Sequence, residues 1–131
     1  LRMLAKGSDK IEFLGGLSDE TLGELYQKAK AFIFPGLEDF GITPLESMYN
    51  GRPVIAYGKG GVLDTVTPET GVFFTEQNVD SLIAAVEKFE REESRFVPAE
   101  LRRHVMGFTR DNFEREYSQF LMKCLRSAGK A

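Results

Sequence analysis

Cysteine and histidine are nearly missing from this sequence, and their scarcity excludes two kinds of architecture. One cysteine among 131 residues leaves no partner for an internal disulfide, so the chain is not a disulfide-stapled domain. One histidine cannot build a histidine-based metal cluster. This composition is typical of a reduced, soluble protein, and we expect a cytoplasmic location.

Long apolar runs and an excess of basic charge are missing as well. No apolar run approaches the roughly 20 residues that a membrane-spanning helix needs, and no signal-peptide pattern is present. The 20 Asp and Glu outnumber the 17 Lys and Arg, which gives a formal net charge of −3 and a pI near 5.3. Nucleic-acid-binding modules are normally basic, so we expect no nucleic-acid partner.

What the sequence does contain is enough apolar material for one folded domain. Apolar residues make up 42% of the chain, with 11 Phe and 4 Tyr, which argues against disorder. A length of 131 residues favours one domain, because domains most often have about 100–150 residues. Since the chain starts at Leu1 rather than at a methionine, we expect a fragment of a larger protein.

Short apolar runs alternate with helical patterns. The runs predict strands at Ile11–Leu14, Ala31–Phe34, Pro53–Tyr57 and Val72–Phe74. The second and third runs suit strands that are buried on both faces. Apolar residues at a helical period predict helices over about 19–29, 44–51, 61–66 and 79–89. Ser18 is the expected N-cap of the first helix, and Thr43, Pro44 and Glu46 occupy the N-cap, N1 and N3 positions of the second.

This alternation of strands and helices defines the fold class. Strands separated by helices of about 8–14 residues imply right-handed βαβ units and a parallel sheet. We therefore predict an α/β fold: a Rossmann-like parallel sheet with flanking helices over 11–92, followed by C-terminal helices over 98–127. Residues 1–131 form one domain on this interpretation.

The C-terminal part of the sequence contains only helical patterns. One helix ends at Gly107, and a second helix, capped by Thr109, runs to about Ser127. Cys124 falls on the apolar face of the last helix, where we expect a core position. We expect His104 on the surface and without a catalytic role.

The loop after the second predicted strand holds the clearest site. In open parallel sheets, ligands bind beyond the carboxyl ends of the strands. Gly41 allows a tight turn there, and Ile42 and Thr43 present free N–H groups at a helix start, which suits a phosphate. Glu38 lies in front of this anion site and Glu46 behind it. A ligand with phosphate in the middle and hydroxyls at both ends, a nucleotide sugar, matches this order.

The stretch EDFGITPLE from Glu38, followed by GRPVIAYGKGG from Gly51, resembles the C-terminal domain of family 4 retaining glycosyltransferases of the GT-B fold. The resemblance runs from about residue 11 to 90. It is strongest to bacterial mannosyltransferases that use GDP-mannose to build O-antigen or exopolysaccharide. It implies half of a GT-B fold, with the acceptor-binding N-terminal domain and the upstream basic residues for the donor phosphates outside this chain. It therefore implies no turnover by this chain alone.

The resemblance also implies roles for particular residues. Glu38 would be the catalytic residue that contacts the donor sugar near the reacting carbon, and Glu46 would accept hydrogen bonds from the ribose. Backbone amides would reach the diphosphate and sugar from Phe40, Gly41, Ile42 and Thr43. Leu17 and Asp19 would flank the base. The substrate would be GDP-mannose or another nucleoside-diphosphate sugar, with no cofactor and no metal, and the sequence has no D-x-D.

Each of these signals has an ordinary structural explanation as well. A capping box places a glutamate at position 46 without any ligand, and Glu38 and Asp39 are equally explained as solvated loop acids. Gly60-Gly61 either contacts a ligand or only makes the tight turn after a strand.

The function and the partners also have alternatives. The same fold serves a non-catalytic nucleotide- or phosphosugar-binding module. A receiver-type signalling domain needs an acidic cluster after its first strand, where this chain has Gly15-Gly16. The last helix is expected to pack on the N-terminal domain of the parent enzyme, and its exposed face would allow a homodimer. We expect the parent to be cytoplasmic, peripheral at the inner face of the membrane.

Overall fold

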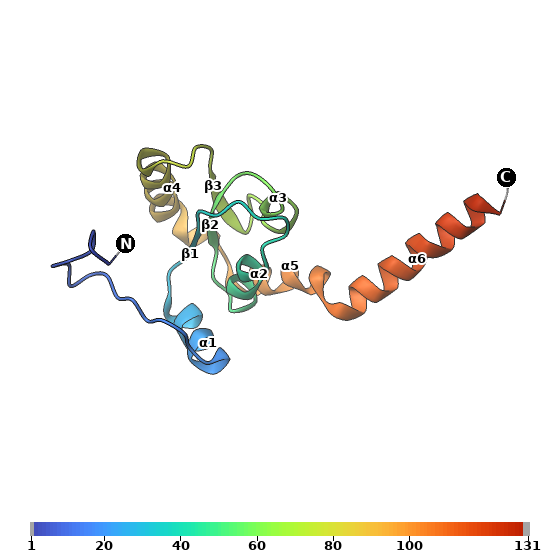
Figure 1. Ribbon diagram of the computed structural model, residues 1–131, viewed down its shortest axis with the longest axis horizontal. Helices are drawn as coiled ribbons and strands as arrows, with labels where there is room; N and C mark the ends of the chain where they lie inside the picture. Colours follow the sequence, from blue (N-terminus) through green and yellow to red (C-terminus); the bar gives the residue numbers. More distant parts are fainter. Residues whose placement is uncertain (1, 130–131) are drawn as a thin grey trace.

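The computed structural model describes residues 2–129 (Figure 1). Its elements in chain order are α1 (Asp19–Lys28), β1 (Phe32–Phe34), α2 (Ile42–Tyr49), β2 (Val54–Tyr57), α3 (Val62–Thr65), β3 (Gly71–Phe74), α4 (Val79–Glu92), the 3-10 turn η1 (Glu93–Arg95), α5 (Pro98–Val105), the 3-10 turn η2 (Met106–Phe108) and α6 (Arg110–Ala128).

The three strands form one parallel sheet in the order β1-β2-β3. Phe32 pairs with Val54, and Val54 pairs with Gly71. The central strand β2 is buried along its whole length, as its uninterrupted apolar sequence predicts for a parallel sheet covered on both faces.

Two apolar clusters cover the two faces of the sheet. Val54 and Ala56 of β2 belong to the first cluster, which α2, α3 and α5 complete. Ile55 and Tyr57 belong to the second cluster, which α4 completes. Figure 1 shows α4 on one side of the sheet and α2 and α5 on the other. Leu101 of α5 is completely buried, so α5 is part of the central core.

The first expected strand is absent, which corrects the prediction for 11–14. These residues have no regular structure, and Ile11, Phe13 and Leu14 are 54%, 41% and 44% exposed. A strand needs a neighbour to pair with its N–H and C=O groups, and β1 pairs only with β2 among the described residues. β1 is therefore an edge strand of this sheet. Ile33 of β1 is 45% exposed, so the expectation that this strand is buried on both faces is wrong.

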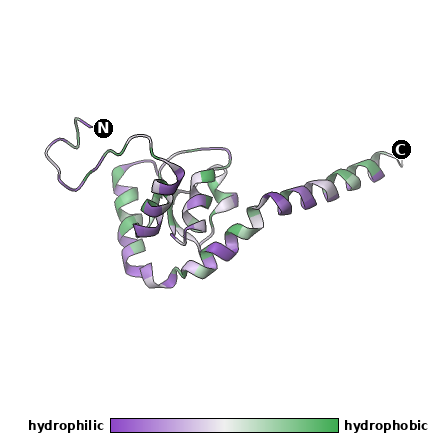
Figure 2. Ribbon diagram, turned by 90° about the horizontal axis from the view of Figure 1, so that it is seen from below, coloured by the Kyte–Doolittle hydropathy of each residue, from purple (hydrophilic) through white to green (hydrophobic). Residues whose placement is uncertain are grey.

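The last helix extends away from the rest of the molecule (Figures 1 and 2). It begins as predicted, with Thr109 Oγ1 accepting from the Asn112 N–H at 3.4 Å. Cys124 is exposed, so the expectation of a core position is wrong. The apolar stripe is real, but none of the described residues of α6 is buried. Within residues 2–129, no helix combines the length and the hydropathy needed to cross a bilayer.

His104 is not a free surface residue, which corrects a further expectation. Its imidazole is half-buried, and its Nε2 lies 2.8 Å from the Thr65 carbonyl oxygen. Because a carbonyl oxygen only accepts, the ring nitrogen is the donor. This hydrogen bond joins α5 to α3 across 39 residues of sequence, a separation that local patterns do not reveal.

Candidate functional site

The loop between β1 and α2 lies beyond the carboxyl end of β1, where parallel sheets place their ligands. It shapes an open hollow of about 590 Å³. One continuous segment lines this hollow: Leu37, Glu38, Asp39, Phe40, Gly41, Ile42 and Thr43. The structure therefore brings together Glu38 and the four residues whose amides were predicted to meet a diphosphate.

The start of α2 carries unpaired backbone donors. Gly41 is the N-cap, with φ 79° and ψ 78°, and no side chain caps the helix. This left-handed conformation costs glycine little and other residues more. Within residues 2–129, neither Ile42 nor Thr43 donates its N–H to another protein group. Both N–H groups lie at the hollow, together with the positive end of the helix dipole.

The predicted capping box is not formed. Helix α2 begins at Ile42, so Thr43 lies in its first turn rather than at the N-cap, and the helix has no side-chain cap. The left-handed Gly41 lets the chain enter the helix two residues earlier than expected. Pro44 then falls at N3, where its missing N–H leaves no helical bond unmade. Capping therefore does not explain the glutamate at position 46.

Glu46 lies beside α1 and does not line the hollow. Its neighbour is Tyr26, whose ring is 7% exposed and packs edge-on against Phe32 at 5.6 Å between ring centroids. Burial, followed by the negative charge of Glu46 and a side-chain hydrogen bond with it, raises the pKa of Tyr26 above its ordinary value of 10.0. Glu38 thus lines the hollow, whereas Glu46 lies next to Tyr26.

The remaining predicted site residues have other surroundings. Leu17 and Asp19 are exposed at the start of α1 and do not line the hollow. Asp19 lies in the first turn of α1, where a carboxylate favours the helix dipole. The Phe40 ring packs against Phe108, with 6.4 Å between centroids, so its side chain is directed to η2.

The glycine pair Gly60-Gly61 has a role that the sequence interpretation did not include. The Gly61 N–H donates to the Glu38 carbonyl oxygen at 2.8 Å. A Cβ on Gly61 would lie 1.9 Å from the Asp39 carbonyl oxygen. The turn after β2 therefore supports the loop that lines the hollow. The only signal in the sequence is the position of a glycine pair directly after a buried strand, next to the strand that feeds the loop.

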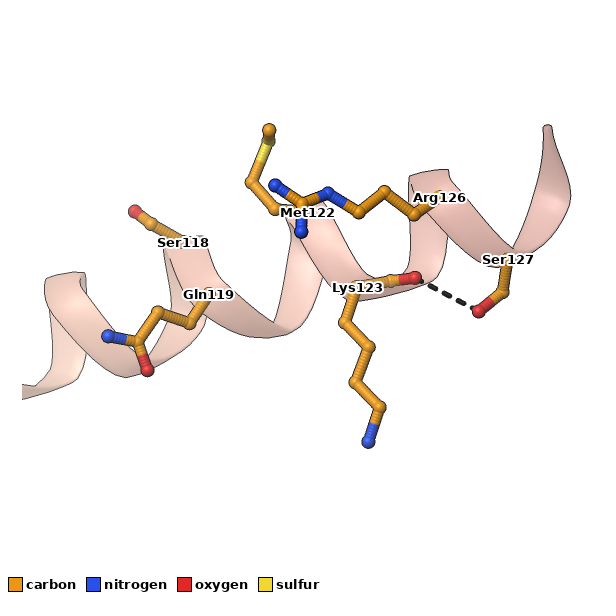
Figure 3. Close-up of a pocket in the computed structure, with 6 residues that line it drawn as sticks. All are labelled: Ser118, Gln119, Met122, Lys123, Arg126 and Ser127. Carbon is orange, nitrogen blue, oxygen red and sulfur yellow. Dashed lines mark hydrogen bonds between the residues drawn. The ribbon is translucent and has the colours of Figure 1, made fainter.

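A second hollow, of about 560 Å³, lies along α6 and is shown in Figure 3. The six residues drawn there belong to one helix, and the side-chain hydrogen bond among them joins Ser127 Oγ to the Lys123 carbonyl oxygen at 3.0 Å. This hollow is the outer surface of a single helix and offers no converging groups. Among the described residues, no three His, Cys, Asp or Glu are grouped so that they could hold a metal ion.

By its parallel sheet, its two helical layers and the free helix start beyond the strands, this chain has the architecture of Rossmann-like α/β proteins. Residues 3–106 match the family described as Glycosyl transferases group 1. Because this match covers most of the chain, the chain belongs to that glycosyltransferase family.

Mannosyltransferases are among its relatives. An α-1,3/1,6-mannosyltransferase of Homo sapiens is 36% identical over 85 residues, which cover 64% of this chain and 20% of that protein. A phosphatidyl-myo-inositol mannosyltransferase of Propionibacterium freudenreichii is 37% identical over 70 residues, or 52% of this chain and 18% of that protein. An uncharacterized glycosyltransferase of Methanocaldococcus jannaschii is 35% identical over 81 residues, covering 60% and 21%. The chain thus spans about a fifth of the length of these relatives.

A solved structure supports the same assignment. Sucrose-phosphate synthase from Thermosynechococcus elongatus superposes with a TM-score of 0.75 and 26% identity, over 99% of this chain and 33% of that one. That enzyme has the GT-B fold. The parallel sheet, its flanking helices and the C-terminal helix are therefore part of a GT-B fold, which confirms the predicted fold class.

Proposed function

We propose that this chain is the donor-binding part of a retaining glycosyltransferase. It would move a hexose, which we infer to be mannose, from a nucleoside diphosphate to an acceptor hydroxyl. The observation that carries this proposal is the pair of unpaired N–H groups at Ile42 and Thr43, which share one hollow with the carboxylate of Glu38. The mannosyltransferase relatives support the choice of sugar.

The proposed reaction breaks the bond between the sugar's anomeric carbon and the diphosphate. Negative charge then grows on the leaving diphosphate, and positive charge grows on the sugar ring. Preorganised N–H donors at a helix start stabilise the leaving group, and such donors contribute about 3–4 kcal/mol each in other enzymes. Glu38 would orient the sugar hydroxyls and stabilise the positive ring, without acting as a nucleophile. No metal or cofactor takes part in this proposal.

The proposed nucleotide contacts lie outside the hollow. Glu46 would accept hydrogen bonds from the ribose hydroxyls with its exposed carboxylate, which Tyr26 holds from the side of α1. Leu17 and Asp19 would flank the base, which requires the ligand to extend past the hollow, since neither residue lines it.

We also propose that the rest of the enzyme supplies the acceptor-binding domain and the basic residues for the donor phosphates. The supporting observation is that the matched segments cover only about a fifth of each relative's length. On this proposal the chain alone has no turnover. The parent enzyme would be cytoplasmic, peripheral at the inner face of a membrane, and would work in polysaccharide or lipopolysaccharide synthesis.

An NMR titration of this chain with GDP, UDP, GDP-mannose and UDP-glucose tests the proposal. We expect saturable shifts at the amides of Ile42 and Thr43, largest with GDP-mannose, while amides of α6 such as Phe120 stay unchanged. Shifts that are equal over the whole chain, or absent from α2, would contradict it. Donor binding without activity, once the acceptor domain is restored, would instead indicate a non-catalytic nucleotide-binding module.

A further inference from the structure

The turn Gly60-Gly61 touches the main chain of the loop that carries Glu38. Besides the hydrogen bond from Gly61 to the Glu38 carbonyl oxygen, a Cβ on Gly61 would lie 2.5 Å from the Phe40 nitrogen and 1.9 Å from the Asp39 oxygen. Real Cβ atoms essentially never approach another atom within 3.0 Å. Because the obstructing atoms are backbone, any larger residue at position 61 must displace the loop.

Position 60 also requires glycine, both for its backbone conformation and for its close approach to the loop. Its φ is +74°, a conformation that favours glycine. A Cβ there would lie 2.7 Å from the Glu38 carbonyl oxygen and 2.8 Å from Leu37 Cδ1. By contrast, a Cβ added to Gly16 or Gly107 would have no other atom within 4 Å. Close approach to the loop is therefore a particular property of the pair after β2.

A second support reaches the beginning of the loop. The Gln77 side chain, from the segment between β3 and α4, donates Nε2–H to the Pro35 carbonyl oxygen at 2.9 Å. Both supports bind main-chain carbonyl groups, and they come from the turns that follow the next two strands of the sheet. They leave the Glu38 carboxylate exposed, without a hydrogen-bond donor among residues 2–129.

We propose that Gly60, Gly61 and Gln77 are positioning residues that hold the Glu38 loop in place for the donor, an inference that rests on the function proposed above. Residues 35–41 have no helix or strand of their own, so their place depends on these main-chain contacts together with the packing of Phe40 against Phe108. Reactions of this kind demand such support, because a misplacement of about 1 Å costs on the order of a hundredfold in rate.

Two variants of this chain test the proposal, each with a matched control. Gly61→Ala adds one methyl group against the loop, and Gly107→Ala adds the same group in open space. Gln77→Ala removes the donor to Pro35, and Gln119→Ala removes an exposed amide on α6. For each variant, amide shifts and ¹⁵N relaxation of residues 37–41 are measured without ligand, together with the melting temperature and the Kd for GDP-mannose.

We expect Gly61→Ala to shift and broaden the amides of residues 37–41 and to weaken donor binding by about tenfold or more. Gln77→Ala should raise the mobility of the loop and weaken binding by about two- to fivefold, at an unchanged melting temperature. Both controls should match the parent chain in every measurement.

The possible outcomes separate this proposal from the function on which it rests. If the parent chain binds no nucleotide sugar, the proposed function fails. The amide data without ligand still show whether Gly61 and Gln77 hold the loop in place. If the amide shifts and relaxation of residues 37–41 in both test variants equal those of the parent chain, the positioning role is overturned, whatever the Kd of the variants for GDP-mannose. If Gly61→Ala does not fold, Gln77→Ala decides alone, because it adds no bulk, and an unchanged loop in that variant overturns the proposal.

Discussion

Helices α4 and α6 carry similar apolar stripes but differ in what those stripes contact. In α4, Ala85 and Phe89 are 5% and 3% exposed and pack on the sheet. In α6, Phe113 and Phe120 are 63% and 61% exposed. The period of apolar residues therefore predicts a helix but not its partner.

The same contrast separates the core from the loop that lines the hollow. Apolar side chains of the core pack against one another. Among the described residues, the N–H groups of Ile42 and Thr43 and the carboxylate of Glu38 have no hydrogen-bond partner. We therefore expect substitutions in the core to affect stability, and substitutions at the unpartnered groups to affect binding and turnover.

The largest effect is expected in the core. Phe89→Ala removes a buried ring that stacks on Phe96 at 5.8 Å between centroids. Such truncations cost about 3–5 kcal/mol of the free energy of unfolding. Urea unfolding followed by circular dichroism measures this loss. A loss below about 1 kcal/mol would show that α4 does not pack on the sheet as described.

Glu38→Ala should come next, measured in an enzyme that includes the acceptor domain. Loss of charge stabilisation at the sugar is expected to lower kcat by about a hundred- to a thousandfold, with much less change in donor KM. Glu87→Ala, at an exposed glutamate of α4, is the control and should leave kcat unchanged. Unchanged kinetics for Glu38→Ala would remove this residue from the mechanism.

Ile42→Pro tests the start of α2 with a single missing hydrogen. Proline fits the first position of a helix, so the variant deletes the Ile42 N–H with little loss of stability. A hydrogen bond to a charged group contributes about 1.5–3 kcal/mol, so we expect GDP binding to weaken by about 10- to 100-fold in calorimetry. Ile42→Ala keeps the N–H and should bind GDP normally. Equal affinity of the two variants would contradict the anion site.

Tyr26→Phe tests the contact between a buried ring and the exposed Glu46. The pKa of Tyr26 is raised in the folded state by burial and then by Glu46, so the phenol stabilises the fold below the unfolded pKa of about 10. This stabilisation is lost as the pH rises through the folded pKa. In urea unfolding, the two proteins should differ below about pH 10 and converge only at higher pH, as the pH passes the folded pKa of Tyr26. Tyr117→Phe, half-exposed on α6, should show no such convergence.

The smallest effect is expected in α6. Phe120→Ala is the exposed counterpart of Phe89→Ala and should change the free energy of unfolding by less than about 0.5 kcal/mol. A loss comparable to that of Phe89→Ala would mean that α6 folds back onto the body in solution.

Elements bounded by local signals could be predicted from the sequence. Strand β2 lies between Pro53 and Gly58 in a fully apolar run, and the caps Ser18 and Thr109 accept from the N–H groups three residues later. Features that depend on distant partners could not. The apolar run at 11–14 has no strand beside it among the described residues.

The candidate site divides in the same way. The hollow-lining segment and the free N–H groups follow from the glycine before a helix start, although the left-handed Gly41 shifts that start by two residues. The position of Glu46 against Tyr26, and the support of the loop by Gly61, depend on contacts between separate elements. Patterns within one stretch of sequence do not contain that information.

The hollow is made by one uninterrupted stretch of seven residues, and this has a consequence for the evolution of the family. On the proposed function, we expect an exchange of that stretch between homologues to alter the contacts to the donor's sugar and diphosphate, while the sheet and its helices stay intact. Such an exchange also requires that the recipient has glycines in the turn after β2, because a side chain there would displace the exchanged loop.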